Sequence, residues 1–317
     1  MTASFNILNI KTILLPLDGS KRSERALPVV RQLATALGAR VKLLHIIERH
    51  PPSSVHGESH LSSVDEATRY LDAVSERMRG EGVFVELHVH DEPEQDVTQS
   101  IASHAAELDA DLVVLVAHGT GGWRNLLFGR VAQQVALRGS RPALVLQDLQ
   151  DGTIAPFPPK VIALPLDGPM HTEGEAVIPA AAAISKAIGA TLRLITVISG
   201  IEFSSQRGPV STLLPSATRA LSDIEEAAAV DYLDDWIVKL RGAGVESSAV
   251  VVHGEPAEKT INEAGRSGAG LLAIVTHPRS PLSGMLSGSV GARALTRFQG
   301  SLLIVRSPDE DQPRTGD

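Results

Sequence analysis

The sequence predicts an α/β fold of two tandem doubly wound domains, each with a five-stranded parallel sheet in strand order 3-2-1-4-5 flanked by helices. Three observations lead to this prediction. Short apolar runs alternate with helical patterns along the chain, which is typical of a parallel sheet covered on both faces. The same series of runs occurs twice. The length of 317 residues also fits two domains of roughly 150 residues each.

The repeat is clearest where an apolar run ends on an aspartate. ILLPLDGS at positions 13–20 returns as IALPLDGP at positions 162–169, and Asp18 and Asp167 stand 149 residues apart. The helical pattern after each copy carries a proline near its start and a glycine at its end. Features that recur in step over this distance indicate a tandem duplication.

Composition suggests where one copy gives way to the next. Residues 148–159, DLQDGTIAPFPP, are polar and then proline-rich, which indicates a short, stiff linker. We therefore expect one domain over residues 1–149 and a second over 150–317. Residues 308–317 lack apolar side chains and are expected to form a disordered tail.

In the first half, buried strands alternate with four helices. The first helical pattern places Ala26, Val30, Leu33 and Leu37 on one face, and Gly38 ends it. A loop rich in proline, serine and histidine follows the second strand. The expected strands are 12–17, 41–47, 83–90, 111–117 and 142–147, the helices 23–38, 64–79, 94–108 and 129–139, and the loop 48–63.

The second half repeats this order of elements. Ten additional residues belong mainly to the segment between its second and third strands. The expected strands are 161–166, 191–198, 247–253, 271–276 and 301–306, and the helices 176–189, 227–244, 256–268 and 288–298.

Composition excludes several classes of partner and chemistry. A net charge of −8 offers no basic surface for a phosphate backbone or an anionic lipid, so neither nucleic acid nor membrane is an expected partner. No apolar run approaches the roughly 20 residues that span a bilayer. The first residues lack the pattern of a secretory signal, so we expect a cytoplasmic protein. The absence of cysteine excludes disulfides, thiolate nucleophiles and cysteine-type zinc sites.

A ligand crevice is expected at the carboxyl ends of the strands. Right-handed crossovers carry the first three strands outward, and the fourth returns to the other side of the first, so the ends of strands one and four flank the crevice. Asp18 would then meet AHGTGG, and Asp167 would meet THPRSP. A carboxylate there can accept hydrogen bonds from a base or sugar, while a glycine turn before a helix can receive phosphate. Alternatively, the two aspartates cap the first helices.

The segments ILLPLDGSKRSERAL, LLHII and VAHGTGGWRNLLFGRVAQQVALRGSRPALVL resemble the universal stress protein family. ALPLDG, HGEPAEKTI and LSGSVGARALTRFQGSLLIVR resemble it again. The resemblance implies a tandem protein of stress adaptation that is not an enzyme, with its two domains joined as an internal pseudo-dimer. It also implies pairing through the fifth strands, 142–147 and 301–306, and leaves a homodimer and an unidentified protein partner open. One branch of the family binds ATP, with Mg²⁺ only alongside the nucleotide, through G-x-x-G, nine residues and G-(S/T).

Neither half keeps that ATP pattern intact. In the first half, Val116 stands at the first glycine and Arg130 at the Ser/Thr. In the second, Val275 and Pro278 replace both glycines of G-x-x-G. Valine methyls take up room that a glycine would leave to the ligand, and proline removes an N–H donor, whereas arginine can hold a phosphate bidentately.

The resemblance still assigns candidate adenine-nucleotide residues in both halves. In the first half, those that would border adenine are Asp18 and Ile46, and those near ribose and phosphates are Gly119, Gly129, Arg130 and Val131. Their equivalents in the second half are Asp167, Val197, Gly288, Ser289 and Val290.

The histidine-rich segments and the possible catalytic motifs have simpler explanations than a metal site or an active site. His56, Glu58 and His60 do not have H-E-x-x-H spacing, which favours a solvated loop over a metal site. His88 and His90 share one face of the third strand. A metal site there is conceivable, but polar residues at the end of a strand are the commoner explanation. No G-x-S-x-G elbow or P-loop lysine motif is present. A scaffold without nucleotide and a slow ATPase remain the alternatives.

Overall fold

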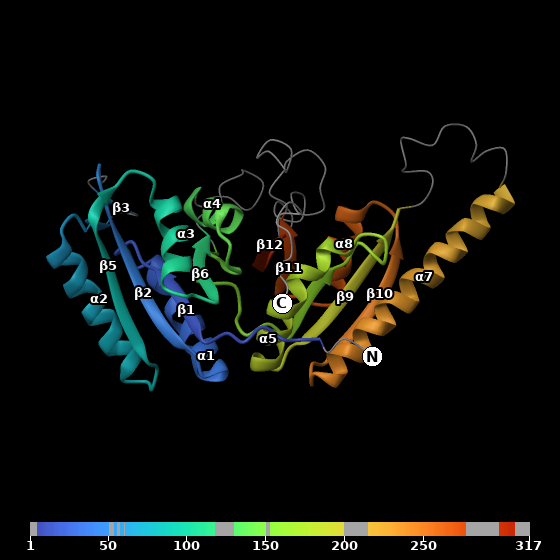
Figure 1. Ribbon diagram of the computed structural model, residues 1–317, viewed down its shortest axis with the longest axis horizontal. Helices are drawn as coiled ribbons and strands as arrows, with labels where there is room; N and C mark the ends of the chain where they lie inside the picture. Colours follow the sequence, from blue (N-terminus) through green and yellow to red (C-terminus); the bar gives the residue numbers. More distant parts are fainter. Residues whose placement is uncertain are drawn as a thin grey trace, which may run out of the picture. The chain divides into compact units, whose positions relative to one another are not determined.

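The computed structural model describes residues 5–50, 54–55, 58–59, 61–117, 130–149, 153–199, 215–276 and 298–307 (Figure 1). The chain divides into two compact units. The N-terminal unit comprises Leu8–Pro158 together with Gln299–Arg306. The C-terminal unit comprises Pro159–Phe298 together with the described residues 5–7 and 307.

The N-terminal unit is built on a sheet with strand order β5-β2-β1-β6-β7-β12. The first five strands in this order pair in parallel, and numbered along their half of the chain they read 3-2-1-4-5, as predicted. Right-handed crossovers place α1 and α2 on one face and α3 and α4 on the other. The strands are β1 (Thr12–Pro16), β2 (Arg40–Glu48), β5 (Val85–Glu94), β6 (Leu112–Ala117), β7 (Ala143–Gln147) and β12 (Ser301–Arg306).

Two parts of the N-terminal unit differ from the prediction. The expected loop contains a two-stranded antiparallel pair with Val55 opposite Glu58. The third strand runs on to Glu94, so the next helix begins at Val97, where the Asp96 carboxylate accepts the Gln99 N–H at 3.1 Å. The remaining elements are η1 (Ser23–Ala26), α1 (Leu27–Leu37), β3 (Ser54–Val55), β4 (Glu58–Ser59), α2 (Val64–Arg79), α3 (Val97–Glu107) and α4 (Arg130–Arg138).

The C-terminal unit repeats the arrangement with the order β10-β9-β8-β11. Its long helix begins at Pro215, twelve residues before the predicted start. Of the predicted helix 288–298, only Phe298 is described, and it lies outside any helix. The elements are β8 (Val161–Pro165), η3 (Thr172–Val177), α5 (Ile178–Ile188), β9 (Thr191–Ile198), α7 (Pro215–Gly242), β10 (Ser247–His253), α8 (Pro256–Arg266) and β11 (Leu271–Thr276).

Pairing of the two fifth strands is confirmed. β12, from the second half of the chain, pairs antiparallel with β7, with Leu303 opposite Leu144. Both leucines are fully buried, so each strand covers what would otherwise be an exposed apolar edge.

Glycines end the first helix of each half as expected. Gly38 has φ +64° after α1, and Gly189 has φ +68° after α5, both in the left-handed region that glycine adopts without strain. This shared geometry supports the duplication inferred from the sequence.

Candidate functional site

The predicted crevice begins where β1 ends between β2 and β6. The Leu17 N–H donates to the Leu44 carbonyl at 2.8 Å, and the parallel register, continued beyond Pro16, sets Asp18 beside Ile46. On the other side, the β1–β6 register continued in the same way sets Asp18 beside Ala117. Three strand ends therefore place Ile46, Asp18 and Ala117 in one row. The predicted strand order sets Asp18 beside the segment that begins at Ala117, and the family resemblance gives Ile46 as its neighbour.

The second half forms an equivalent row. The Leu166 N–H donates to the Ile195 carbonyl at 2.8 Å, and the register continued from Pro165 sets Asp167 beside Val197. The β8–β11 register sets Asp167 beside Thr276. Asp18 is partly buried whereas Asp167 is exposed, so the two rows differ in how far they shield a carboxylate.

Asp18 shapes a turn and does not stand at the N-cap position of a helix. Its Oδ1 accepts the Ser20 backbone N–H at 2.9 Å and the Ser20 hydroxyl at 2.7 Å. The N-cap residues of η1 and α1, Arg22 and Ala26, have no side-chain capping bond. The corresponding residues before η3 and α5 have none either. The N-cap positions of the first helices are thus occupied by other residues, Arg22 and Ala26 in the first half and His171 and Val177 in the second.

A buried histidine, His45, contacts the backbone just before Asp18 in the first row. His45 is 2% exposed, and its Nδ1 lies 2.7 Å from the Leu17 carbonyl oxygen, which can only accept, so this nitrogen carries the proton. Thr196 holds the equivalent place in the second half. Sequence reasoning missed His45 because it reads as one more member of an apolar strand.

Two residues of the expected loop contact the Asp18 turn. The Lys21 N–H donates to Glu58 Oε2 at 2.6 Å. Gly19 has φ +87°, and a Cβ added there would lie 2.8 Å from Cγ and Cδ1 of Leu61. In the second half Gly168 has φ +93°, but the atom nearest to a Cβ added there would be a methyl carbon of Thr196, at 3.8 Å. Glu58, expected in a solvated loop, is thus a partner of the site's backbone.

This difference predicts unequal effects of two equivalent substitutions. Alanine at Gly168 is expected to cost about 1–2 kcal/mol through its left-handed backbone alone. Alanine at Gly19 is expected to cost about 1–3 kcal/mol more, because Leu61 must also move. Urea unfolding of both variants followed by circular dichroism measures the difference. Equal losses would contradict the packing of Leu61 on this turn.

The chain's two tyrosines occupy equivalent places beside these turns. The Tyr232 hydroxyl donates to Glu175 Oε1 at 2.8 Å, and Trp236 Nε1 donates to the same oxygen at 3.2 Å. Burial and then Glu175 raise the pKa of Tyr232, while burial and then Glu24 raise the pKa of Tyr70. Both hydroxyls therefore stay protonated at neutral pH. Equivalent spacing of the tyrosines in the two halves is the signal that sequence reasoning overlooked.

Two arginines near the first turn are held by a buried carboxylate. Asp148, at the end of β7, has a side chain 1% exposed and forms ion pairs with Arg22, at 2.5 Å from Nε, and with Arg25. These contacts bind the start of the predicted linker to η1. Asp148 thus neutralises positive charge beside the candidate site.

The remaining candidates are only partly described. Arg130 begins α4, and Val131 is 39% exposed on that helix. Several predicted ligand residues lie outside the described residues: Gly119, Gly129, Gly288, Ser289 and Val290. His56 and His60 lie outside them too. Within the described ranges, no three His, Cys, Asp or Glu residues are arranged to hold a metal ion.

The comparison with known proteins agrees with the duplication seen in the structure. A sequence model of the Universal stress protein family matches residues 9–147 and again residues 159–306. A universal stress protein of Synechocystis sp. is 28% identical over 119 residues, covering 38% of this chain and 74% of the relative. One from Thermus aquaticus is 29% identical over 144 residues, covering 43% of this chain and 98% of the relative.

Solved structures match nearly the whole chain. A putative universal stress protein from Pseudomonas aeruginosa has a TM-score of 0.66 at 16% identity and covers 94% of each chain. A universal stress protein from Archaeoglobus fulgidus has a TM-score of 0.62 at 16% identity, covering 94% of this chain and 98% of that one. At this level of identity the likeness shows the fold. Separately, no helix in the described part of the chain is long and apolar enough to cross a membrane.

Proposed function

Because the chain belongs to the universal stress protein family, which its two halves match in turn, we propose that it acts in the stress response by binding an adenine nucleotide, without catalysing a reaction. The observation that carries the proposal is the row formed by Ile46, Asp18 and Ala117 at the ends of three parallel strands. Ligands of open α/β sheets bind at this edge.

The chemistry of the row suits an adenine or a ribose. Ser20 orients the Asp18 carboxylate, and a carboxylate is the kind of acceptor that pairs with the amino or hydroxyl groups of a nucleoside. Ile46 is 6% exposed and gives the row an apolar side. Carboxylates repel phosphates, so the phosphates are expected toward the start of α4, with Mg²⁺ arriving only with the nucleotide.

The N-terminal unit is the better candidate of the two. Asp18 is partly buried and organised by a turn, whereas Asp167 is exposed. In addition, Pro278 removes a backbone donor from the second half. We therefore expect one nucleotide per chain, bound in the N-terminal unit.

Calorimetric titration with ATP and Mg²⁺ tests this proposal. Asp18→Ala is expected to weaken binding about 10- to 100-fold, the worth of one hydrogen bond to a charged group. The matched variant Asp167→Ala is expected to leave affinity unchanged within about twofold, because the second half contributes no site. Absence of binding to the unaltered protein, or equal losses in the two variants, would contradict the proposal.

A ligand-free interaction protein is the second candidate function. Glu58 and Leu61 already contact the backbone of the Asp18 turn, and this is the observation that favours it. Such a protein would show no thermal shift with ATP and would bind a protein partner instead. A slow ATPase would release phosphate in the presence of ATP and Mg²⁺, and the release would disappear in Asp18→Ala.

A further inference from the structure

Three histidines lie together between the outer strand β5 and helix α3 of the N-terminal unit. His88 and His90 share one face of β5, as the sequence predicts, and His104 comes from α3. The His104 ring lies 4.9 Å from the His88 ring and 4.8 Å from the His90 ring, centroid to centroid. His104 is 6% exposed. Positive charges on these rings would therefore repel one another at close range with little screening by water.

One ring nitrogen of His104 is hydrogen-bonded to the backbone of its own helix. Its Nδ1 lies 2.8 Å from the Ser100 carbonyl oxygen and must donate to it, which leaves Nε2 as the site for a second proton. Nε2 lies 4.0 Å from Glu107 Oε2, too far for a hydrogen bond. Burial, followed by the rings of His104 and His90, lowers the pKa of His88.

Strands β2 and β5 and helix α3 each contribute charged groups near the three histidines. Lys42 of β2 donates from Nζ to the Leu108 carbonyl at the end of α3, at 3.0 Å, and also lies 3.4 Å from Glu86 Oε2. Lys42 lowers the pKa of His88, while Glu107 of α3 raises it. At the end of β5, Glu94 Oε1 lies 3.5 Å from His90 Nε2. Two carboxylates thus offset part of the repulsion, and Lys42 adds to it.

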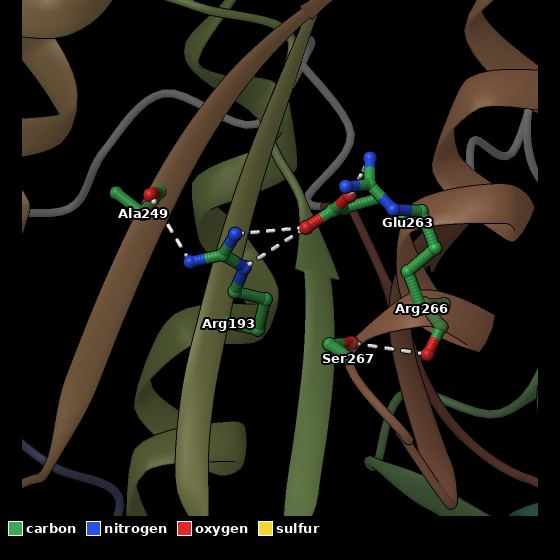
Figure 2. A network of polar contacts seen from close by, with 6 residues as sticks. Arg193, Ala249, Glu263, Arg266 and Ser267 are labelled. Atoms are coloured by element: carbon green, nitrogen blue, oxygen red, sulfur yellow. Dashed lines mark hydrogen bonds and ion pairs between the residues drawn. The ribbon is translucent and has the colours of Figure 1, made fainter.

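The C-terminal unit replaces this cluster with an ion pair (Figure 2). The strand register places Val250 and Val252 at the positions of His88 and His90. Counted from the helix starts, Glu263 of α8 occupies the place of His104. Glu263 accepts from Arg193 Nη2 at 2.8 Å. This pair contains no imidazole, the side chain whose ordinary pKa of about 6.5 lies between pH 5 and 8.

Helix α3 in turn contacts the helix that leads from the candidate phosphate site. The Thr98 hydroxyl donates to Gln134 Oε1 at 3.0 Å, and Arg138 Nη1 lies 3.0 Å from Asp96 Oδ2. Both contacts join α3 to α4. A displacement of α3 would therefore also displace α4, the helix that begins at Arg130.

We propose that His88, His90 and His104 form a proton-responsive cluster, which holds α3 against the sheet while the rings are neutral and loosens α3 and α4 when they gain protons below about pH 6.5. The C-terminal unit, with valines and an ion pair in the same places, does not respond. This inference goes beyond the proposed function, because it concerns the helices themselves and holds with or without a nucleotide.

The direction of the response follows from proton linkage. Folding lowers the pKa of His88, so the unfolded or locally opened chain binds a proton more readily than the folded chain. The stabilisation is complete above the pKa of an unfolded histidine, about 6.5, and is lost as the pH falls from there through the lower folded pKa.

Hydrogen–deuterium exchange of the full chain at several pH values between 7.5 and 5.5 tests the proposal, with α8 as the reference in the same molecule. Protection of α3 relative to α8 is expected to stay constant above about pH 6.5 and to fall below it, by up to about tenfold per pH unit for each proton taken up on opening. The variant His88→Val with His90→Val, which carries the residues of the C-terminal unit, is expected to lose most of this response. The control His50→Gln, at an exposed histidine, is expected to keep it.

Equal loss of protection in α3 and α8, or an unchanged response in the double variant, would overturn the proposal. If that variant does not fold, NMR titration of the imidazole protons in the unaltered protein decides instead. His88 is expected to titrate below the ordinary histidine pKa of about 6.5, with steps coupled to the other two rings. Three rings that titrate independently of one another would also overturn it.

Discussion

Replacing Glu263 by alanine is expected to destabilise the C-terminal unit by about 3 kcal/mol, because it leaves Arg193 without its carboxylate in a mostly buried place. The Glu263 side chain is 7% exposed and that of Arg193 24% exposed. Arg193 also donates to the Ala249 carbonyl at 3.2 Å, a single bond that offsets only part of the loss (Figure 2). Urea unfolding followed by circular dichroism provides the measurement.

The same cluster offers a matched control. Arg266 also contacts Glu263, at 3.3 Å, but its side chain is 78% exposed. Arg266→Ala is therefore expected to change stability by less than about 1 kcal/mol, as for other exposed ion pairs. If the two variants were equally stable, the contact with Arg193 would have no special role in holding α8 to the sheet.

Alanine at Asp148 is expected to have a comparable effect on the N-terminal unit, a loss of about 3 kcal/mol. It removes a carboxylate that is 1% exposed and leaves Arg22 and Arg25, whose side chains are 25% and 31% exposed, without their shared partner. Partial access of water to both arginines limits the loss. Thermal and urea unfolding measure it.

The exposed pair between Arg77 and Glu24 provides the comparison. Arg77 Nη2 lies 2.8 Å from Glu24 Oε2, but the arginine side chain is 57% exposed. Arg77→Ala is expected to cost less than about 1 kcal/mol. Asp148→Asn, which keeps the shape and one acceptor, should fall between the two. An Asp148→Ala protein as stable as Arg77→Ala would show that the linker is not fixed through this carboxylate.

Strand order and duplication could be predicted because each depends on signals local in sequence. Uninterrupted apolar runs mark strands covered on both faces, and glycines such as Gly38 and Gly189 mark helix ends. Strand order places Asp18 beside Ala117 whatever the details of side-chain packing. The row of strand ends at the candidate site could therefore be predicted from the sequence, whereas the residues that would bind a ligand there stay a prediction.

Features that depend on packing between distant segments could not be predicted in this way. His45 lies within an apolar run, and only the structure shows its bond to the Leu17 carbonyl. His104 lies in an ordinary helical pattern, and nothing local indicates that it meets His88 and His90. In α7, residues 220–228 are almost all exposed, so no apolar stripe marks this part of the helix.

The β7–β12 pair has a consequence for how the protein is made. The N-terminal unit receives its last strand from Ser301–Arg306, almost 300 residues after its first strand begins at Thr12. During translation, the edge of β7 stays unpaired by β12 until Ser301–Arg306 have left the ribosome. A nascent chain that lacks these residues exposes the apolar edge of β7, and an unpaired edge of this kind can pair with other chains.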